Sequence, residues 1–405
     1  NYTLDPSKGP QGDYWNRNFT GVSRSNVLLS KLQAGIPGLD AATTSRYIAE
    51  AKFLRAYYYF DLVRLFKNVP LFTEPVSTDL FYNALQVAPE LVYAQVEKDL
   101  TESMADLPLT VPGNTQGGRV TQGTAKALLG KVFLYEKKWS AAAQQLAEVN
   151  GTPGGTSKYG YKLQTNFADI FKTTNKFNSE SILEIVKTTV ANSDWGAWGR
   201  FEGNVAVQMF GPRGYSGPTY VSGWSFNPVL PALANLMKND PRYTATITDI
   251  DSLEKIGKAS YEKGYMNTGY FIEKFAPKLE NKSTGGGVPE LNWPNDYIEI
   301  RLADTYLMEA EALVQANGDM ARAAALLNAV RARVGLNPKP ATLDNIYLER
   351  RLELATEGHR WYDLVRTGRA PAVLGSRGFI AGKHEILPIP LSELTNTKLV
   401  QNPNY

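Results

Sequence analysis

The strongest constraint on the fold is helical periodicity near the C-terminus, between residues 295 and 369. Apolar residues recur there every three or four positions, a spacing that places them on one face of a helix. The first apolar stripe consists of Ile300, Ala303, Leu307, Ala310 and Val314. Glycine and proline follow at intervals, so the pattern predicts several helices joined by short turns.

Three more helices are expected in this stretch. Gly318 would end the first helix in a left-handed turn, and Asp319 would cap the second. Asp344 is the expected cap of the third helix, and Gly358 separates that helix from the fourth. Short connectors make successive helices antiparallel neighbours, and the period is close to the ~34 residues of a tetratricopeptide repeat.

A second helical region is expected between residues 13 and 150. Its helices are predicted near residues 13–33, 44–66, 89–107, 121–136 and 137–149. The second of these is apolar around most of its circumference, which is typical of a buried central helix. Charges on such a helix need partners, so we expect Arg55 or Asp61 to pair with a residue of the C-terminal helices.

Residues 151–293 lose the helical periodicity and gain glycine, proline and aromatic residues. Alternation at 181–187 predicts a short strand, and residues 227–242 predict a short helix. Long irregular segments often carry binding residues. We therefore expect an all-α dominated chain in which TPR-like helical hairpin repeats form an α-α superhelix. Its expected parts, within one domain, are helical repeats at 13–150, a loop-rich insertion at 151–293, helical repeats at 294–370 and a tail at 371–405.

Composition excludes several classes of protein. Forty-three basic and 40 acidic residues give a net charge of +3, which leaves no electrostatic footprint for nucleic acid. The chain has no cysteine and only two histidines, His359 and His384, so we expect neither a metal site nor a cofactor. No apolar run approaches the roughly 20 residues that span a bilayer.

The most densely charged segment is residues 349–366. Glu353, Glu357, His359 and Asp363 could supply acid–base chemistry or ligands there. Pairing along and between helices explains the same residues more simply, and we favour it. A phosphate-binding loop follows a strand and ends in Lys-Ser/Thr before a helix. The glycine-rich segments at 211–218 and 283–287 lack this pattern, so they do not predict phosphate-binding loops.

The aromatic residues of the insertion are the best candidates for ligand contacts. A sugar ring has an apolar CH face and a rim of hydroxyls, which a flat aromatic ring and nearby polar groups can meet. Any one tryptophan is more often core than platform, but glycine-flanked Trp195 and Trp198 belong to no helical or strand stripe. The candidate ring residues are Trp195, Trp198, Tyr215, Tyr220, Trp224 and Trp293, and the candidate polar residues are Arg213, Asn192 and Asp194.

Five sequence blocks in order resemble the SusD/RagB family, lipid-anchored outer-membrane nutrient-binding proteins of Bacteroidetes. None of the blocks is a catalytic signature. They read AEAKFLRAYYYFDLVRLFKNVPL, IRLADTYLMEAEAL, LNAVRARVGL, ERRLELATEGHRWYDLVR, and ILPIPLSEL followed by QNPNY.

The resemblance implies a SusD-like fold and a non-enzymatic role. Such a protein captures an oligosaccharide at the cell surface and delivers it to a SusC-like TonB-dependent transporter, which the face of the helical repeats would contact. The family's lipid-bearing cysteine, its outer-membrane anchor, would lie upstream of Asn1. The ligand loops implied are residues 1–13, with Tyr2 as their aromatic candidate, residues 192–224, and the approach to Trp293.

Three alternatives stay open on the sequence. A peptide-binding, RagB-like member of the same family would need an extended groove with backbone-directed hydrogen bonds. An all-helical glycoside hydrolase would need two carboxylates about 5–9.5 Å apart, and no motif nominates such a pair. A cytoplasmic repeat scaffold for protein partners is the third, and a lipoprotein signal upstream of Asn1 would exclude it.

Overall fold

The structure is a computed structural model that describes residues 2, 4–197 and 202–405. The chain forms two compact units, each made of segments distant in sequence. Unit 1 comprises residues 1–110, 120–148 and 360–405, and unit 2 comprises residues 111–119 and 149–359. The borders differ from the predicted segments, because the C-terminal tail groups with the N-terminal helices and the helices after residue 294 group with the insertion.

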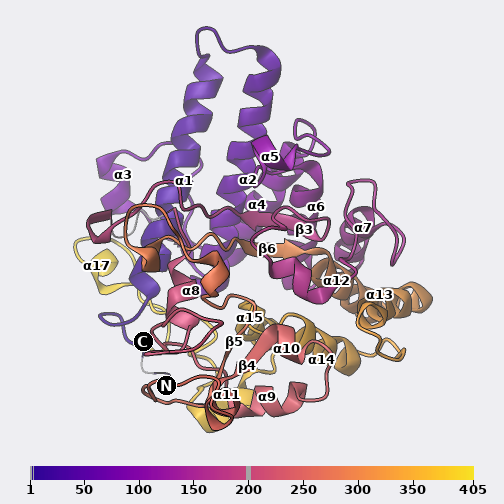
Figure 1. The fold of residues 1–405 in the computed structure, drawn as a ribbon. Helices are drawn as coiled ribbons and strands as arrows, with labels where there is room; N and C mark the ends of the chain where they lie inside the picture. The colour runs from indigo at the N-terminus through magenta and orange to yellow at the C-terminus, as the bar shows by residue number, and fades with distance from the viewer. Residues whose placement is uncertain (1, 3, 198–201) are drawn as a thin grey trace. The chain divides into compact units, whose positions relative to one another are not determined.

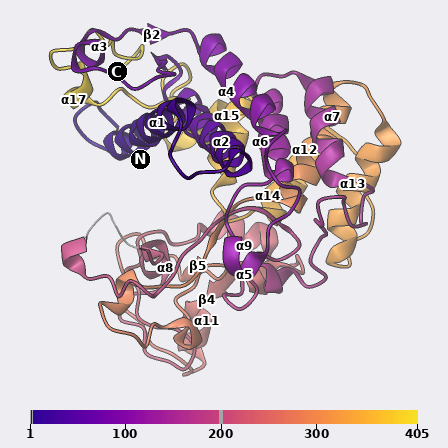
Figure 2. The ribbon, with the colours of Figure 1, turned by 90° about the horizontal axis from the view of Figure 1, so that it is seen from above.

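Unit 1 is built on a long helical hairpin, α1 (Gln11–Ala34) and α2 (Ala41–Phe66), drawn in indigo in Figure 1. Helix α4 (Pro89–Ser103) packs beside α2, and α6 (Gln122–Tyr135) packs beside α4, as Figure 2 shows. The predicted helices of this region are therefore confirmed to within a few residues. The other elements of unit 1 are β1 (Val69–Pro70), paired antiparallel with β2 (Gln86–Val87), α3 (Thr78–Asn83), most of α7 (Trp139–Asn150) and of α15 (His359–Arg366), α16 (Ala370–Leu374), η5 (Gly375–Arg377) and α17 (Leu391–Leu394).

Helix α2 supplies much of the core of unit 1. Phe53, Tyr59 and Phe60 are at most 1% exposed, which confirms the predicted central, buried helix. The predicted partner of its charges was wrong. Arg55 forms a two-pronged pair with the buried Asp99 of α4, at 2.7 and 2.8 Å, because α4 rather than a C-terminal helix packs on this face. Asp61 pairs with Arg64 of its own helix.

Three regular helices of unit 2 are α12 (Leu302–Gln315), α13 (Met320–Arg333) and α14 (Leu343–Glu353), with α13 and α14 both packed beside α12. Asp319 caps α13 as predicted, accepting from Arg322 N at 2.9 Å. Two predicted boundary residues were wrong. The left-handed residue after α12 is Asn317, at φ +50°, and not Gly318. Thr342 and not Asp344 caps α14, because its hydroxyl accepts from the N–H three residues on.

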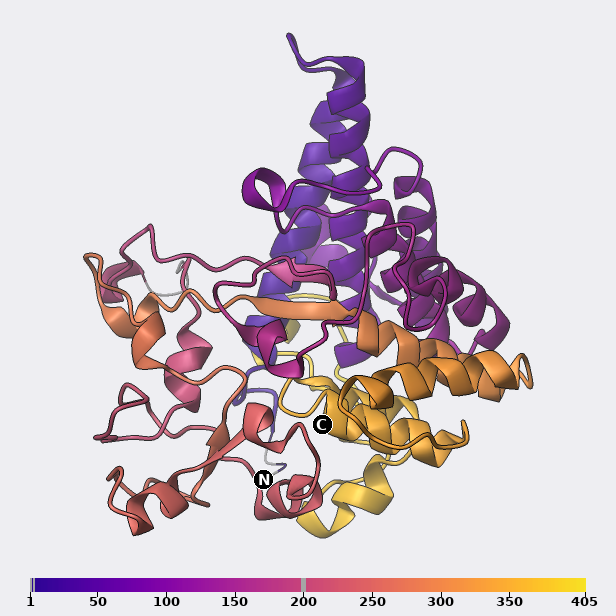
Figure 3. The same ribbon diagram turned by 45° about the vertical axis from the view of Figure 1, so that its right-hand side comes forward.

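Short strands join distant parts of unit 2. Figure 3 shows β3 (Ser181–Ile185) antiparallel to β6 (Tyr297–Arg301), so Ile300 lies in a strand and not in the predicted helix. The predicted strand at 181–187 is confirmed. The other elements of unit 2 are β4 (Ile247–Asp249), antiparallel to β5 (Tyr270–Ile272), with α5 (Gly113–Gln116), α8 (Val205–Phe210), α9 (Pro231–Met237), α10 (Tyr243–Thr246), α11 (Ile250–Lys255), η1 (Phe167–Phe171), η2 (Trp195–Ala197), η3 (Leu279–Asn281) and η4 (Pro289–Leu291).

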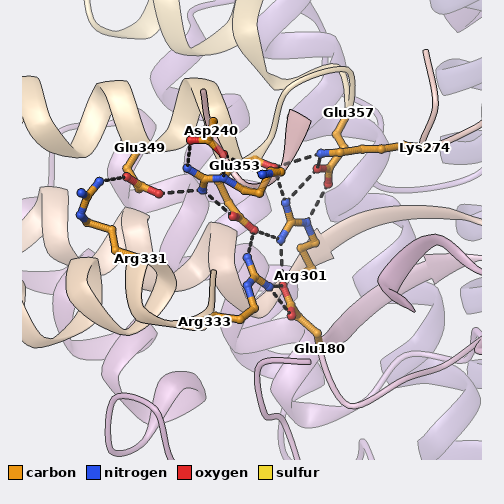
Figure 4. Close-up of polar contacts among 10 residues, drawn as sticks. Glu180, Asp240, Lys274, Arg301, Arg331, Arg333, Glu349, Glu353 and Glu357 are labelled. Carbon is orange, nitrogen blue, oxygen red and sulfur yellow. Dashed lines mark hydrogen bonds and ion pairs between the residues drawn. The ribbon is translucent and has the colours of Figure 1, made fainter. Parts of the chain in front are cut away.

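The interior of unit 2 contains a network of buried ion pairs, shown in Figure 4. Glu353 is its centre, because its carboxylate accepts from Arg242 at 2.8 Å, from Arg301 at 2.6 Å and from Arg333. Charges of opposite sign balance in the network, which a dry interior requires. Its members are Glu180, Asp240, Glu349, Glu353 and Glu357 with Arg242, Lys274, Arg301, Arg331 and Arg333.

The network explains the dense charges of residues 349–366. Surrounding guanidinium groups, opposed by burial, hold the pKa of Glu353 well below its usual range, and Arg301 and Lys274 likewise lower the pKa of Glu357. Asp363 pairs with Arg366 at 2.7 Å. The carboxylates of Glu353 and Glu357 are therefore ionised, and the pairing interpretation holds for Glu353, Glu357 and Asp363.

Candidate functional site

Two of the predicted tryptophans meet in unit 2. The rings of Trp195 and Trp224 are stacked, with centroids 6.1 Å apart and planes 22° apart. Phe226 lies beside Trp224, at 5.5 Å between centroids. Trp195 is 49% exposed and Phe226 59% exposed, while Trp224 is half-buried. We call these three residues the aromatic platform, because together they present ring surface to solvent.

Helix α8 holds the half of the platform that carries Trp224. The backbone N–H of Trp224 donates to the carbonyl of Gln208, and that of Phe226 donates to the carbonyl of Met209, both at 2.9 Å. Ser225 between them has φ +56°, so the chain turns at this residue, and the rings of Trp224 and Phe226 lie side by side. Phe226 was not among the predicted ring residues, and its sequence surroundings do not distinguish it.

The loop that carries Trp195 is braced by a buried asparagine. Asn292 is fully buried, and its side chain both accepts from Ser193 N at 2.9 Å and donates to Ser193 O at 2.8 Å. Gly287 lies against the same backbone at φ +81°, where a Cβ would come within 2.5 Å of the carbonyl of Asn192. The close approach therefore requires glycine at 287, and the exposed Trp195 rests on a well-fixed loop.

Trp293 is a core residue, which corrects its prediction as a ring for ligand. It is 1% exposed within an apolar cluster, so no face of it is available. Its indole N–H donates to the side-chain oxygen of Gln208 at 3.2 Å, and the Gln208 amide donates to Ser222 O at 2.8 Å. Trp293 thus braces the residue whose carbonyl holds Trp224.

The two predicted tyrosines of this region are also core residues. Tyr215 and Tyr220 are each 7% exposed and pack edge to face, with centroids 5.3 Å apart. The hydroxyl of Tyr220 donates to Glu273 at 2.7 Å, and burial raises the pKa of Tyr220 well above its ordinary value. Both rings pack in an apolar cluster with Ile250 and Phe271, so the prediction that they offer faces to a ligand is corrected.

The three predicted polar residues are exposed near the platform. Asn192 and Asp194 flank Ser193 in the Trp195 loop, and Asp194 accepts from Gly196 N at 2.9 Å. The backbone N–H of Arg213 donates to the hydroxyl of Ser225, at 2.8 Å, which places Arg213 beside Trp224 and Phe226. Within the described part of the chain the guanidinium of Arg213 has no ion-pair partner.

Two predicted ring residues stand apart from this arrangement. Trp198 lies outside the described residues. Tyr2 belongs to unit 1, where it is half-buried and stacks on His384, with centroids 5.0 Å apart, and meets the edge of Phe379. Burial lowers the pKa of His384, and its Nδ1 accepts from Ile380 N at 2.8 Å. These contacts give His384 a structural role.

Two cavities lie away from the aromatic platform. One of about 630 Å³ in unit 1 is bordered by Trp15, Phe19 and Phe81, and one of about 500 Å³ in unit 2 is bordered by Phe171, Lys274 and Asn295. Among the described residues no three His, Cys, Asp or Glu side chains gather as metal ligands, and no helix has the length and apolarity to cross a membrane. The exposed rings of the platform offer a surface to a flat apolar face of a ligand.

Comparison with known proteins identifies the family. Residues 179–381 match the model of the SusD family, and residues 1–134 match a model described as "starch-binding associating with outer membrane". The chain belongs to the SusD family. Its mostly helical fold with short strands in the loops is the SusD-like fold that the sequence predicted, and it is a non-catalytic, glycan-binding surface protein of this family.

Three relatives illustrate the similarity. A solved structure of a laminarin-binding SusD-like protein is 52% identical and has a TM-score of 0.96, covering all of this chain and 88% of that one. Surface glycan-binding protein A from Bacteroides thetaiotaomicron, solved in complex with laminarihexaose, is 30% identical with a TM-score of 0.84, covering 96% of this chain and 85% of that one. SusD-like protein P25 from Formosa agariphila is 27% identical, covering 94% of this chain and 76% of the relative.

Proposed function

We propose that this protein captures a laminarin-type glucan at the cell surface on its aromatic platform and passes it to a SusC-like TonB-dependent transporter. The observation that carries the proposal is the stacked, exposed pair of Trp195 and Trp224. A folded protein gains nothing from leaving a tryptophan half exposed on a braced loop, whereas the CH face of a glucose ring gains a flat partner there.

The polar residues around the platform suit a neutral sugar chain. Arg213, Asn192 and Asp194 offer both donors and acceptors to the hydroxyl rim. Laminarin is favoured over other glucans because the relatives with 52% and 30% identity are described with laminarin and laminarihexaose. No bond is broken in this mechanism, so affinity and release rate are the functional quantities.

Titration calorimetry with laminarihexaose tests the ligand. We expect saturable binding to the wild-type protein and a loss of most of that affinity in Trp195→Ala. Maltohexaose is the matched ligand, because it contains as many glucose units in a different linkage. A folded sample that gives no heat with either glucan would refute the proposal, and preference for maltohexaose would replace laminarin by starch.

Handover requires an anchor and a transporter, and both are part of the proposal. The anchor would be a lipid on a cysteine upstream of residue 1, which labelling of the full-length protein in cells with a fatty-acid analogue detects. The transporter would copurify with this protein from solubilised outer membranes. Absence of both lipid and transporter from a well-expressed sample would leave a glycan-binding protein without the delivery role.

A further inference from the structure

A turn in unit 2 exposes two large apolar side chains, those of Tyr265 and Met266. Tyr265 is 86% exposed, the highest value among large apolar side chains in the described chain, and the neighbouring Met266 is 65% exposed. Met266 also has φ +54°, a conformation unfavourable for a residue with a long side chain. Strain of this kind persists only where the surroundings impose it, and it is often associated with function.

Hydrogen bonds fix this turn in place. The backbone N–H of Asn267 donates to Gly264 O at 3.1 Å, which closes the turn, and the Asn267 amide donates to the hydroxyl of Tyr261 at 2.9 Å. Ser216 and Ser260 exchange two backbone hydrogen bonds of 2.9 Å, which tie the segment before the turn to the platform's scaffold. Tyr265 and Met266 are therefore held out from an ordered base.

The turn lies next to the aromatic platform. A Cβ at Gly264 would stand 3.3 Å from the Cβ of Ser225, the residue between Trp224 and Phe226. Consecutive Cα atoms are about 3.8 Å apart. Tyr265 is one residue from Gly264, and Trp224 and Phe226 are each one residue from Ser225, so the turn and the platform are neighbours. Arg213 connects the two areas, since its N–H donates to Ser225 and its carbonyl accepts from Glu262 N at 2.9 Å.

We infer that Tyr265 and Met266 form a second contact area for the same glucan chain, with Arg213 between them and the platform. The inference rests on the proposed function and deepens it, because a site with two apolar areas binds an extended oligosaccharide better than a short one. Isolated exposed apolar residues are common and need no explanation. Here an aromatic ring and a thioether stand together on a rigid turn that continues an exposed ring surface.

Dependence of affinity on ligand length tests the inference. Affinities of wild type, Trp195→Ala and Tyr265→Ala are measured for laminaribiose and laminarihexaose. We expect Trp195→Ala to weaken both ligands, and Tyr265→Ala to weaken the hexasaccharide about three- to tenfold while leaving the disaccharide unchanged. Ile256→Ala is the matched control, because Ile256 is 62% exposed in the same unit and should affect neither ligand.

The outcomes separate this inference from the proposed function. An unchanged hexasaccharide affinity in Tyr265→Ala, or an equal loss for both ligands, overturns the second contact area while the Trp195→Ala result upholds the platform. If wild type binds neither glucan, the proposed function fails and the inference falls with it. Met266→Asn is a second variant, since asparagine tolerates the left-handed conformation; we expect the same length-dependent loss at smaller size.

Discussion

The buried ion network and the aromatic platform belong to the same unit, and each departs from the usual distribution of residues between core and surface. The network places charges where apolar residues normally lie, and the platform places aromatic rings where polar residues normally lie. Every carboxylate of the network is paired with cations. These ion pairs hold α14, β6 and α13 together and leave no carboxylate of the network available to a ligand. The platform leaves part of its ring surface exposed to solvent. Exposed ring surface on an ordered base, and not a high density of charge, is therefore the ground on which we propose the binding region.

Removing the centre of the network should give the largest effect. Glu353→Ala leaves three buried guanidinium groups without their shared carboxylate, so we expect a loss of about 3–5 kcal/mol in the free energy of unfolding. Chemical denaturation measures it. Lys172→Ala is the control, because Lys172 is exposed and its surface pair with Asp169 should contribute little to the free energy of unfolding. Similar values for the two variants would mean that the network is not the framework we describe.

Removing the second ring of the platform should change binding and not folding. Trp224→Ala is expected to cost about 2 kcal/mol of binding free energy, or roughly thirtyfold in Kd for laminarihexaose, as for a central aromatic contact. Calorimetry gives the Kd, and a melting curve checks the fold. Phe81→Ala is the matched control, since Phe81 is 51% exposed on α3 of unit 1. Equal affinities for Trp224→Ala and wild type would contradict the platform.

The buried Trp293 should matter to binding only through Gln208. Trp293→Phe removes the indole N–H that donates to Gln208, and we expect about three- to fivefold weaker binding, close to 1 kcal/mol. A double-mutant cycle with Gln208→Leu distinguishes positioning from general destabilisation. If the hydrogen bond is the link, the effects on Kd will be less than additive. Additive losses would assign Trp293 to packing alone.

A buried carboxylate outside the network offers the test that is most specific to pH. Burial, reinforced by Asp296, raises the pKa of Glu184 to about 7. A carboxyl whose folded pKa is raised stabilises the fold fully below its unfolded pKa of about 4.3 and loses that contribution as pH rises through 7. Glu184→Gln should therefore be more stable than wild type at pH 8 but not at pH 4. Equal pH profiles of unfolding free energy for the two proteins would contradict this pKa.

Sequence periodicity predicted the helices well, because amphipathic spacing and caps are local. The hairpin of α1 and α2, the Asp319 cap and the strand at 181–187 follow from neighbours within a few residues. The errors came where partners are distant. Arg55 needed Asp99, which is 44 residues away, and no local pattern marks that pair.

The candidate site could be predicted as a region but not residue by residue. The insertion was expected to carry exposed rings, and Trp195 and Trp224 fit that expectation. Trp293 shares their composition and setting, yet a bond to Gln208 across 85 residues places it in the core. Phe226 and Tyr265 have ordinary sequence surroundings, and only the contacts of α8 and Gly264 place them beside the tryptophans.

The sequence by itself determined that this chain is a helical repeat protein of the SusD family with an irregular aromatic insertion, since period, caps and motif blocks are written in consecutive residues. Only the tertiary structure decided which rings face solvent and which charges neutralise one another. The physical reason is that burial is a property of what packs on a residue from elsewhere in the chain, and that information is not contained in the residue's own neighbours.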